Sequence, residues 1–458
     1  MYNKSVNINF GTAVRSFFHS AEGFMAQYQN DAQRRKQARN QKRAKQQRRR
    51  RRTILMMALI LAAAAMAFFF RSGWEPDGTE PPAVQTTAPD ETVPRETAAP
   101  RPQTGTTVIH IAAAGDLNVT DTVLANAAHE NGYDFSQTFL DVAPILSGAD
   151  LTLLNFEGNL SGGTYGYDTG AAPLELPKAL KAIGVDAVQT ANSAAIRQGV
   201  SGLVTTLESF EHVGLLALGT YADTESFRES GGYEIVEVDG IRIALVAFTK
   251  GMDNLGLPAG SDNCVNLLYE DYSTDYKKVD TDRIDRILDN VAEDQPDLTI
   301  AMVHWGSEYN DEISDSQEKI CAQLLDSGVD IILGTHPHLV QKVDYDPVGK
   351  TLVAWSLGDF FGDGVMAGTN YSVLLDLEIT RDNGSGEVFL SGWNYTPTFI
   401  LKPEQSASGG HRVVRIREAM ARYEEEFVGR VTEDTYGDMA YALKRIEERI
   451  NPKPKDNK

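Results

Sequence analysis

The sequence predicts an α/β fold with buried, largely parallel strands for the part of the chain that follows residue 105. From residue 106, short apolar runs rich in Val, Ile and Leu alternate with stretches of helical periodicity, such as 201–213 and 314–327. Hydrophobic residues make up 42% of the 458 residues and charged residues 23%, which is usual in globular proteins and excludes a wholly disordered chain. The two cysteines, Cys264 and Cys321, are too few for a disulfide framework or a four-cysteine zinc site.

The first 71 residues predict a cytoplasmic tail followed by a membrane anchor. Residues 1–52 carry 14 Lys and Arg against two acids, and the uncharged run ILMMALILAAAAMAFFF follows at 54–70. As a helix this run is about 25 Å long, the short end of a membrane span. Since Lys and Arg concentrate on the cytoplasmic side, we predict a single-pass protein with tail 1–52 inside, anchor 53–71, and the C-terminal domain outside the cell. The alternative is a cleaved signal peptide, but three phenylalanines follow the small-residue triplet at 65–67.

The basic tail and the acidic remainder of the chain differ in charge, which limits the partners that each can bind. The 406 residues after the tail carry 29 basic and 62 acidic residues, so they are not expected to bind nucleic acid. No aromatic residue interrupts the basic stretch 31–52, which therefore lacks a stacking platform for bases and is interpreted as a topology signal attracted to anionic lipid. Residues 72–104 hold seven prolines and six threonines, which predicts an extended linker over 72–105.

Beyond the linker, the apolar runs end in polar residues suited to metal binding. The terminal residues of these runs are Asp116, Glu157, Asn192, His304, His336 with His338, and Asp359. Ligands of open α/β sheets bind beyond the carboxyl ends of the strands, so we expect these side chains to converge at one edge. Carboxylate, amide and imidazole donors without cysteine suit Mn²⁺, Zn²⁺ or Fe²⁺.

The histidines are the strongest evidence for this metal site. The chain has eight histidines, and three of them follow two of the apolar runs. His336 and His338 flank a proline after a Gly-Thr pair, where proline forces a loop and both imidazoles need partners. Taken singly, Asp116 could belong to a turn, and Glu157 could cap a helix or pair with a lysine. The other histidines are expected to be structural or on the surface.

Six features occur in a fixed order between residues 106 and 365. They are AAAGD (112–116), NFEGNL (155–160), HWGSEY (304–309), Gln317 in a following helix, GTHPHLVQ (334–341) and SLGDFF (356–361). Together they resemble the CapA family of poly-γ-glutamate capsule biosynthesis proteins. The resemblance implies a fold similar to the calcineurin-like metallophosphoesterases, a four-layer sandwich of two packed sheets flanked by helices, over residues 106–400. Residues 401–458 are then expected to form a helical extension, with helices near 412–428 and 434–450, and a polar tail.

The resemblance also implies a divalent metal site holding one or two ions. The residues implied as ligands are Asp116, Glu157, His304, His336 and His338. Residues expected to assist them are Asn192, Glu308 and Asp359. In such folds two metals about 3.5–4 Å apart activate a water and stabilise displacement at phosphorus.

The sequence departs from the family pattern at two adjacent positions. The family usually ends its third ligand strand in an Asn-His pair, where this chain has Ser193 and Ala194. Serine is a weak neutral ligand, and alanine cannot transfer a proton, so no catalytic residue is assigned. Asp359 stands where the family often has asparagine, either holding a cation more tightly or forming part of a solvated loop.

Two functions from different classes follow. The first is a membrane-anchored accessory protein that binds metal and acts in the synthesis or export of a capsular polymer such as poly-γ-glutamate, with synthase-complex subunits and the polymer as partners. The second is an active metal-dependent phosphoesterase-like hydrolase acting on a cell-surface substrate. The helices after residue 400 either cap the domain or serve a partner.

Overall fold

The computed structural model describes residues 105–160, 163–406, 409–422 and 432–450, which all belong to one unit, Gly105–Lys458. The predicted tail, the predicted anchor and all but the last residue of the predicted linker lie outside these ranges. Among the described helices, none combines the length and the apolar character that crossing a membrane requires.

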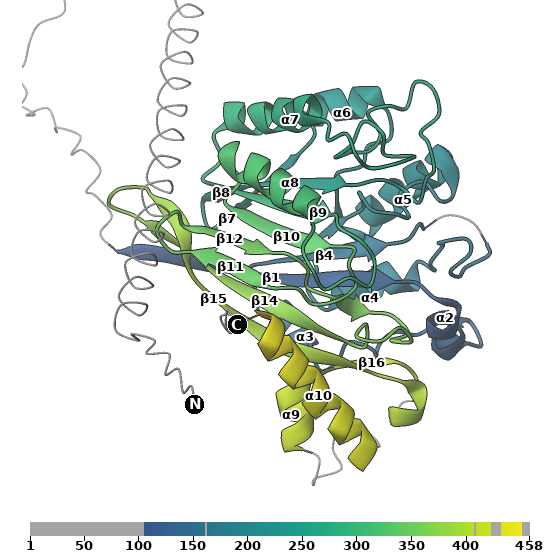
Figure 1. Cartoon of the computed structure of the whole chain (residues 1–458). Helices are drawn as coiled ribbons and strands as arrows, with labels where there is room; N and C mark the ends of the chain where they lie inside the picture. Colours follow the sequence, from purple (N-terminus) through teal and green to yellow (C-terminus); the bar gives the residue numbers. More distant parts are fainter. Residues whose placement is uncertain (1–104, 161–162, 407–408, 423–431, 451–458) are drawn as a thin grey trace, which may run out of the picture. The chain divides into compact units, whose positions relative to one another are not determined.

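The larger of two main sheets has eight strands, among them the first and the last strand of the described unit (Figure 1). Its order is β16-β15-β14-β1-β4-β5-β6, with β13 pairing beside β1. The strands β1, β4, β5, β6 and β13 run parallel, whereas β14, β15 and β16 are antiparallel to their neighbours. The bounds are β1 Thr106–Asn118, β4 Leu151–Glu157, β5 Ala187–Gln189, β6 Leu216–Leu218, β13 Asp359–Phe361, β14 Tyr371–Asp382, β15 Val388–Leu401 and β16 Arg412–Arg415.

The second sheet has six strands in the order β11-β12-β10-β9-β8-β7. Its central strands β8, β9, β10 and β12 are parallel, and β7 and β11 pair antiparallel at the two edges. The bounds are β7 Glu234–Val238, β8 Ile241–Thr249, β9 Leu298–His304, β10 Ile331–Thr335, β11 Val343–Asp346 and β12 Thr351–Ala354. A separate two-stranded ribbon joins β2 Ala128–His129 to β3 Gly132–Tyr133.

Helices α2 to α5 and α7 to α8 cover the outer faces of the two sheets, which gives mixed α/β layers. Apolar residues of α2, α3, α4 and α5 pack with the outer face of β1 and β4, and those of α7 and α8 pack with the outer face of β8, β9 and β10 (Figure 1). In α7 the buried residues Ile284, Ile287, Leu288 and Val291 follow the spacing of one helical face. The bounds are α2 Asp121–Ala127, α3 Ala143–Leu146, α4 Glu175–Ala182, α5 Gly199–Val213, α6 Thr224–Ser230, α7 Thr281–Asp294 and α8 Asp315–Asp326.

The interior between the sheets is a single apolar cluster drawn from both of them. In β1, Ile109 and Ile111 face this cluster, whereas Ala112 and Ala114 face the outer helices, so the strand is buried on both sides. Gly115 lies where β1 passes against the chain at Gly358, and a Cβ atom there would meet the Gly358 carbonyl oxygen at 1.9 Å. The glycine before Asp116 therefore allows the backbone contact that sets the position of that carboxylate.

The last apolar run of the sequence divides between the two sheets. Its first half forms β12 in the six-stranded sheet, whereas Asp359 begins β13 in the eight-stranded sheet. Gly358, with φ of +78°, lies at the turn between them, in a backbone conformation that favours glycine. The prediction of one strand over this run was therefore wrong, although its last residue still reaches the same edge.

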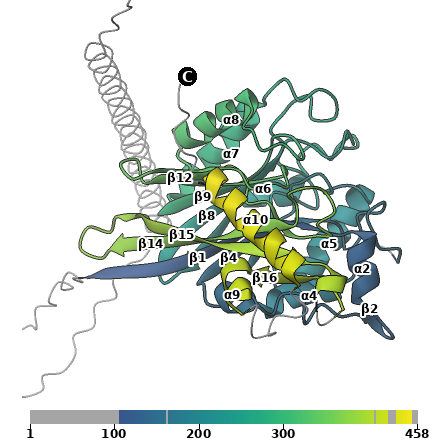
Figure 2. The ribbon, with the colours of Figure 1, turned by 60° about the horizontal axis from the view of Figure 1, so that its bottom comes forward.

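The segment after residue 400 is part of the fold rather than a separate extension. After the 3₁₀ turn Pro403–Gln405 it forms strand β16, where we expected a helix, because buried Val413 and Val414 extend the sheet beside β15. Two helices follow β16, α9 Ile416–Ala421 and α10 Glu433–Ile450. Figure 2 shows α10 lying across β14 and β15, and its residues Met439, Ala442 and Ile446 join the inter-sheet cluster.

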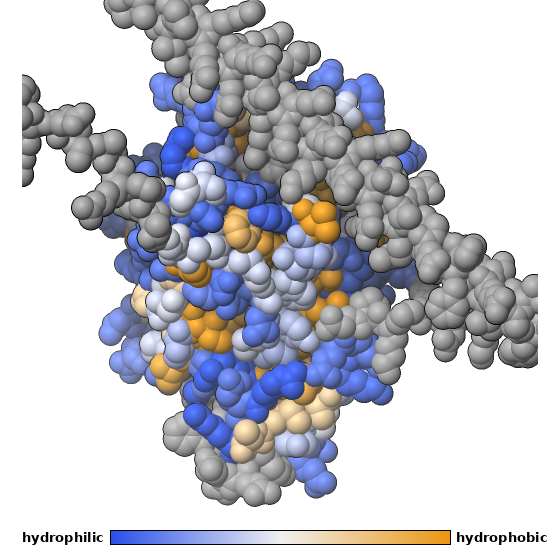
Figure 3. Space-filling view, turned by 90° about the vertical axis from the view of Figure 1, so that its left-hand side faces the viewer, coloured by the Kyte–Doolittle hydropathy of each residue, from blue (hydrophilic) through white to orange (hydrophobic). Residues whose placement is uncertain are grey.

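The outer surface is mainly hydrophilic on the side shown in Figure 3, where apolar residues are scattered in small groups. Large exposed apolar side chains in the described ranges come from separate elements and loops, among them Tyr167, Tyr309, Val365 and Tyr441. Of these, Tyr309 lies beside the cluster of polar side chains described next.

Candidate metal centre

The carboxyl ends of parallel strands from both sheets bring the predicted site residues together. Asp116 lies near the end of β1 and Glu157 ends β4, while His304 ends β9. His336 and His338 directly follow β10. The predicted convergence of the five principal residues is thus seen, and their ligand atoms form three overlapping groups, each with all atoms within 4.8 Å of one another.

The first group contains Glu157, His304 and His336. Glu157 Oε1 lies 3.5 Å from His304 Nε2, and the rings of His304 and His336 are 4.5 Å apart between centroids. The Thr335 hydroxyl donates to Gln189 Oε1 at 3.2 Å, so it accepts the hydrogen of His304 Nδ1, which is 3.1 Å away. This arrangement leaves His304 Nε2 unprotonated, as a metal ligand requires, and the Ser193 backbone amide donates to it at 3.3 Å.

The second group contains Asp116, His338 and Asp359. His338 Nδ1 lies 2.7 Å from Asp359 Oδ1 and 3.7 Å from Asp116 Oδ2. A carboxylate that accepts the Nδ1 hydrogen of a histidine orients its other nitrogen toward a metal, and Asp359 is placed for this role. Asn118 Nδ2 also donates to Asp359 Oδ1 at 2.9 Å, which fixes the carboxylate.

The third group connects the first two through their histidines. It contains His336, His338 and the exposed Glu308, which lies in the loop after β9. Both histidines have positive φ values, +91° for His336 and +57° for His338, in a region that non-glycine residues rarely adopt. The backbone amide of His336 donates to Asp116 Oδ2 at 3.1 Å, so the His-Pro-His turn is tied directly to β1.

Burial sets the protonation of the carboxyl groups in the site. Desolvation raises the pKa of Asp116 to about 6 and that of Glu157 to about 7, against the counteracting charge of His338. Desolvation likewise raises the pKa of Asp359 to about 6. These carboxyls therefore hold protons more tightly than exposed ones do, and a cation would compete with those protons.

The histidines divide into two kinds. Desolvation, reinforced by the neighbouring cationic groups, lowers the pKa of His304 and of His336 well below the usual value, which keeps both rings neutral and able to bind a cation. Burial alone also lowers the pKa of His338, but neighbouring carboxylates, Asp359 foremost, outweigh it and raise this pKa well above the usual value.

Two buried polar atoms of the first group have no hydrogen-bond partner among the described residues. They are Glu157 Oε2 and His336 Nδ1. Leaving such atoms unsatisfied in the interior costs free energy, whereas a bound cation would pair with them. The residues present therefore fit a divalent ion, and their oxygen and nitrogen donors suit Mn²⁺, Zn²⁺ or Fe²⁺.

Ser193 and Ala194 lie at this site but with altered chemistry. The Ser193 hydroxyl donates to Glu157 Oε1 at 2.6 Å and lies 2.9 Å from His304 Nε2. Ala194 is buried, and its backbone carbonyl accepts from Asn159 Nδ2 at 2.7 Å. Position 193 thus presents a hydroxyl to the first group, while position 194 presents no proton donor.

Asn192 reaches the site through another asparagine. Its Nδ2 donates to Asn155 Oδ1 at 2.9 Å, and Asn155 Nδ2 donates to Asp116 Oδ1 at 2.6 Å. Asn192 Oδ1 accepts from the backbone of Ala194 at 3.1 Å. Asn192 therefore orients Asp116 indirectly.

Three residues that bear on the site were missed in the sequence. Asn118 and Asn155 each lie two positions from a carboxylate in the same strand, and residues two apart share a face, so this spacing was a usable signal. Lys250 directly follows β8, and its Nζ lies 3.4 Å from His336 Nε2. The sequence feature that identified the histidines also applies to Lys250, because it is a polar residue at the end of an apolar run.

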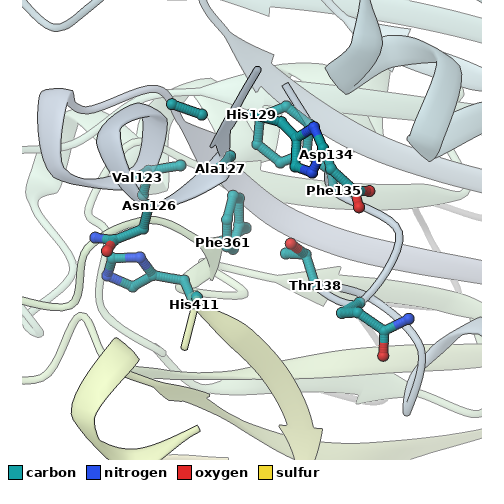
Figure 4. A pocket seen from close by; sticks show the side chains of 12 residues that line it. Val123, Asn126, Ala127, His129, Asp134, Phe135, Thr138, Phe361 and His411 are labelled. Carbon is teal, nitrogen blue, oxygen red and sulfur yellow. The ribbon is translucent and has the colours of Figure 1, made fainter. Parts of the chain in front are cut away.

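A pocket lies away from the metal-ligand groups, between α2, β13 and the residues just before β16 (Figure 4). Its lining includes Val123, Asn126, Phe135, Phe361 and His411. His411 is buried, and its Nδ1 has no hydrogen-bond partner among the described residues. Burial lowers the pKa of His411, so the ring is neutral. The pocket shares no residue with the three ligand groups.

Comparison with known proteins gives one family match and two relatives. The profile described as "Bacterial capsule synthesis protein PGA_cap" matches residues 110–363. "Capsule biosynthesis protein CapA" of Bacillus anthracis is 28% identical over 292 residues, 62% of this chain and 67% of that protein. "PGA biosynthesis protein CapA" of Bacillus subtilis (strain 168) is 27% identical over 256 residues, 54% of this chain and 62% of that protein.

Among solved structures, the chain is similar to the calcineurin-like phosphoesterase YfkN from Bacillus subtilis. The two are 12% identical, and the match covers 74% of this chain and 100% of that chain with a TM-score of 0.37.

Proposed function

The chain belongs to the bacterial capsule synthesis protein family PGA_cap, and we propose from that premise that it is a metal-binding protein of capsule biosynthesis. The observation that carries the proposal is the convergence of Asp116, Glu157, His304, His336 and His338 at one sheet edge, with two unpaired buried atoms in their midst. A divalent ion held there would supply a Lewis-acid centre for an anionic ligand.

The protein's own residues would divide the work of holding the ion. His304 and His336 are kept neutral by burial, and Glu157 Oε2 has no hydrogen-bond partner among the residues that the structure describes. Asp359 orients His338, while the Asn192–Asn155 pair orients Asp116. No imidazole stands at position 194 to give a proton to a leaving group, which favours an accessory role in the synthesis or export of a capsular polymer such as poly-γ-glutamate.

Membrane anchoring is part of this proposal. Residues 1–52 would remain in the cytoplasm, the run 54–70 would cross the membrane, and the described domain would lie outside the cell, where subunits of a polymer synthase and the polymer itself are the expected partners. The charge contrast between the tail and the domain supports this arrangement.

Complementation of a capsule-deficient deletion strain tests the proposal. We expect wild-type chain to restore surface polymer, and the variant His336→Ala to fail although it reaches the same level in the membrane fraction. The matched control is Lys350→Gln, in the turn before β12, which should restore the polymer. Full complementation by His336→Ala would contradict a function that depends on the ligand groups.

The second candidate is an active metal-dependent phosphoesterase, and the complete set of five principal ligand residues favours it. Full-length protein would be assayed with a generic phosphodiester in the presence and absence of Mn²⁺. We expect little turnover. Robust Mn²⁺-dependent turnover that His336→Ala abolishes would establish the enzyme and show that another group supplies the proton.

A further inference from the structure

Lys250 is built into the edge of the sheet that carries the ligand groups. It is the first residue after β8, and the register of β8 with β9 places Thr249 opposite His304. Its backbone amide donates to the His304 carbonyl at 2.8 Å. The backbone of this lysine is thus fixed to the backbone of a ligand residue.

The side chain of Lys250 also lies beside the ligand residues. Nζ donates to the Gly306 carbonyl at 2.9 Å, lies 3.4 Å from His336 Nε2 and stands 4.6 Å from the centre of the Tyr276 ring. The residue is partly buried between these groups. These contacts hold the ammonium group beside His336 and limit the positions it can take.

Unlike other cations near the site, Lys250 forms no ion pair with a carboxylate in the described part of the chain. Arg197 pairs with Asp253, and Arg449 pairs with Asp311 at 2.9 Å. Glu308 and Asp253 act on Lys250 only through space. A positioned ammonium without a carboxylate partner, next to a group of metal ligands, is suited to receiving an anionic oxygen.

We propose that Lys250 is an oxyanion-binding residue, which receives one oxygen of a phosphate or carboxylate group on the ligand that approaches the metal-ligand groups. This inference rests on the proposed function for the identity of the site and adds to it the charge of the ligand. It also places one cation beside the site of a domain that is strongly acidic overall, whereas the proposed polymer is an anion.

The test measures anion binding directly, by calorimetry on the full-length chain with and without Mn²⁺. Inorganic phosphate and glutarate serve as the two probes. We expect Lys250→Met to weaken binding of at least one probe about tenfold or more, as loss of a hydrogen bond to a charged group does. Lys250→Arg should keep affinity within about threefold, because a cationic donor remains. A loss for phosphate alone assigns a phosphate ligand, and a loss for glutarate alone assigns a carboxylate.

The control is Lys350→Met, which removes the same charge near the opposite edge of the six-stranded sheet, in the turn before β12. Equal weakening by both variants, unchanged binding in Lys250→Met, or no binding of either probe by the wild-type chain would overturn the inference. Mn²⁺ content is measured in every sample. A chain that binds anions through Lys250 but binds no Mn²⁺ would contradict the proposed metal site while supporting the role of the lysine.

Discussion

The side chain at position 193 determines how the first ligand group can hold a cation. Ser193 contacts both Glu157 and His304, so it already lies where an asparagine ligand is expected from the family pattern. At such a position a hydroxyl oxygen is a weaker neutral metal ligand than an amide oxygen. The neighbouring Ala194 is buried, so a larger side chain there must displace its surroundings.

Restoring the Asn-His pair of the family at positions 193 and 194 should raise hydrolytic activity, because it supplies a ligand and a proton donor that Ser193 and Ala194 do not. For Ser193→Asn combined with Ala194→His, we expect phosphodiester turnover with Mn²⁺ to increase about 10²-fold or more, the usual contribution of a positioned general acid. Because overpacking costs about 1–3 kcal/mol, the melting temperature is recorded alongside. Ser193→Ala is the control and should not raise activity. A folded double variant with unchanged turnover would show that the missing pair is not what limits catalysis.

Metal binding should weaken as the pH falls. The pKa of Glu157 is raised to about 7 and those of Asp116 and Asp359 to about 6, so near pH 5.5 these carboxyls are mostly protonated in the metal-free protein. His338 also holds its proton, so metal must displace several protons. We expect the Mn²⁺ dissociation constant to be at least about tenfold larger at pH 5.5 than at pH 8, measured by calorimetry. An affinity independent of pH would contradict the protonation states assigned here.

At the scale of elements, the C-terminal helix supports the loop that borders the site. Arg449 of α10 donates to Asp311 at 2.9 Å, and Asp311 lies in the same loop as Glu308 and Tyr309, between β9 and α8. The ring of Tyr309 stacks on His338 with centroids 5.6 Å apart. Gln341, after β10, donates to the carbonyl of Asn310 at 2.9 Å and fixes the loop from the other side.

Loss of the α10 contact should destabilise this region. Arg449→Ala removes a mostly buried guanidinium, and we expect the free energy of unfolding to fall by about 1.5–3 kcal/mol in urea titrations. The control Arg417→Ala removes an exposed pair with Glu447, for which a change of about 0.2–1 kcal/mol is typical. Equal effects of the two substitutions would contradict a supporting role for Arg449.

The strand ends were predictable from the sequence because two simple rules determine them. Apolar runs identify buried strands, and parallel strands present their carboxyl ends at one edge. Those rules located Glu157 and His304 from residue order alone. Helical periodicity likewise indicated helices over 201–213 and 314–327, where the structure has α5 and α8.

The remaining features depend on partners that sequence spacing does not reveal. The Thr335–Gln189 bond that sets the tautomer of His304 joins residues 146 positions apart. Strand β16 forms because the free edge of β15 is available, and this overrides the helix-like charge pattern of its segment. The packing of α10 into the inter-sheet cluster likewise depends on a surface built from β14 and β15.

At the scale of the whole molecule, the unequal charge of tail and domain predicts a protein oriented across a membrane. Protease added to intact cells should digest the chain beyond about residue 105 and spare an N-terminal fragment, because we predict that the basic tail stays inside. Immunoblotting with tags at the two ends of the chain reports the outcome. Protection of the C-terminal tag in intact cells, followed by digestion after lysis, would contradict this topology.

Mn²⁺ binding by the full-length chain shows whether the ligand groups hold a divalent ion. Calorimetry at pH 8 would compare wild type with Glu157→Gln, His336→Ala and the distant control Lys350→Gln. We predict saturable binding of one or two ions by wild type and the control, and at least about tenfold weaker binding by each ligand variant. Wild-type affinity in Glu157→Gln and His336→Ala, or no binding by a folded wild-type chain to Mn²⁺, Zn²⁺ or Fe²⁺, would contradict the account.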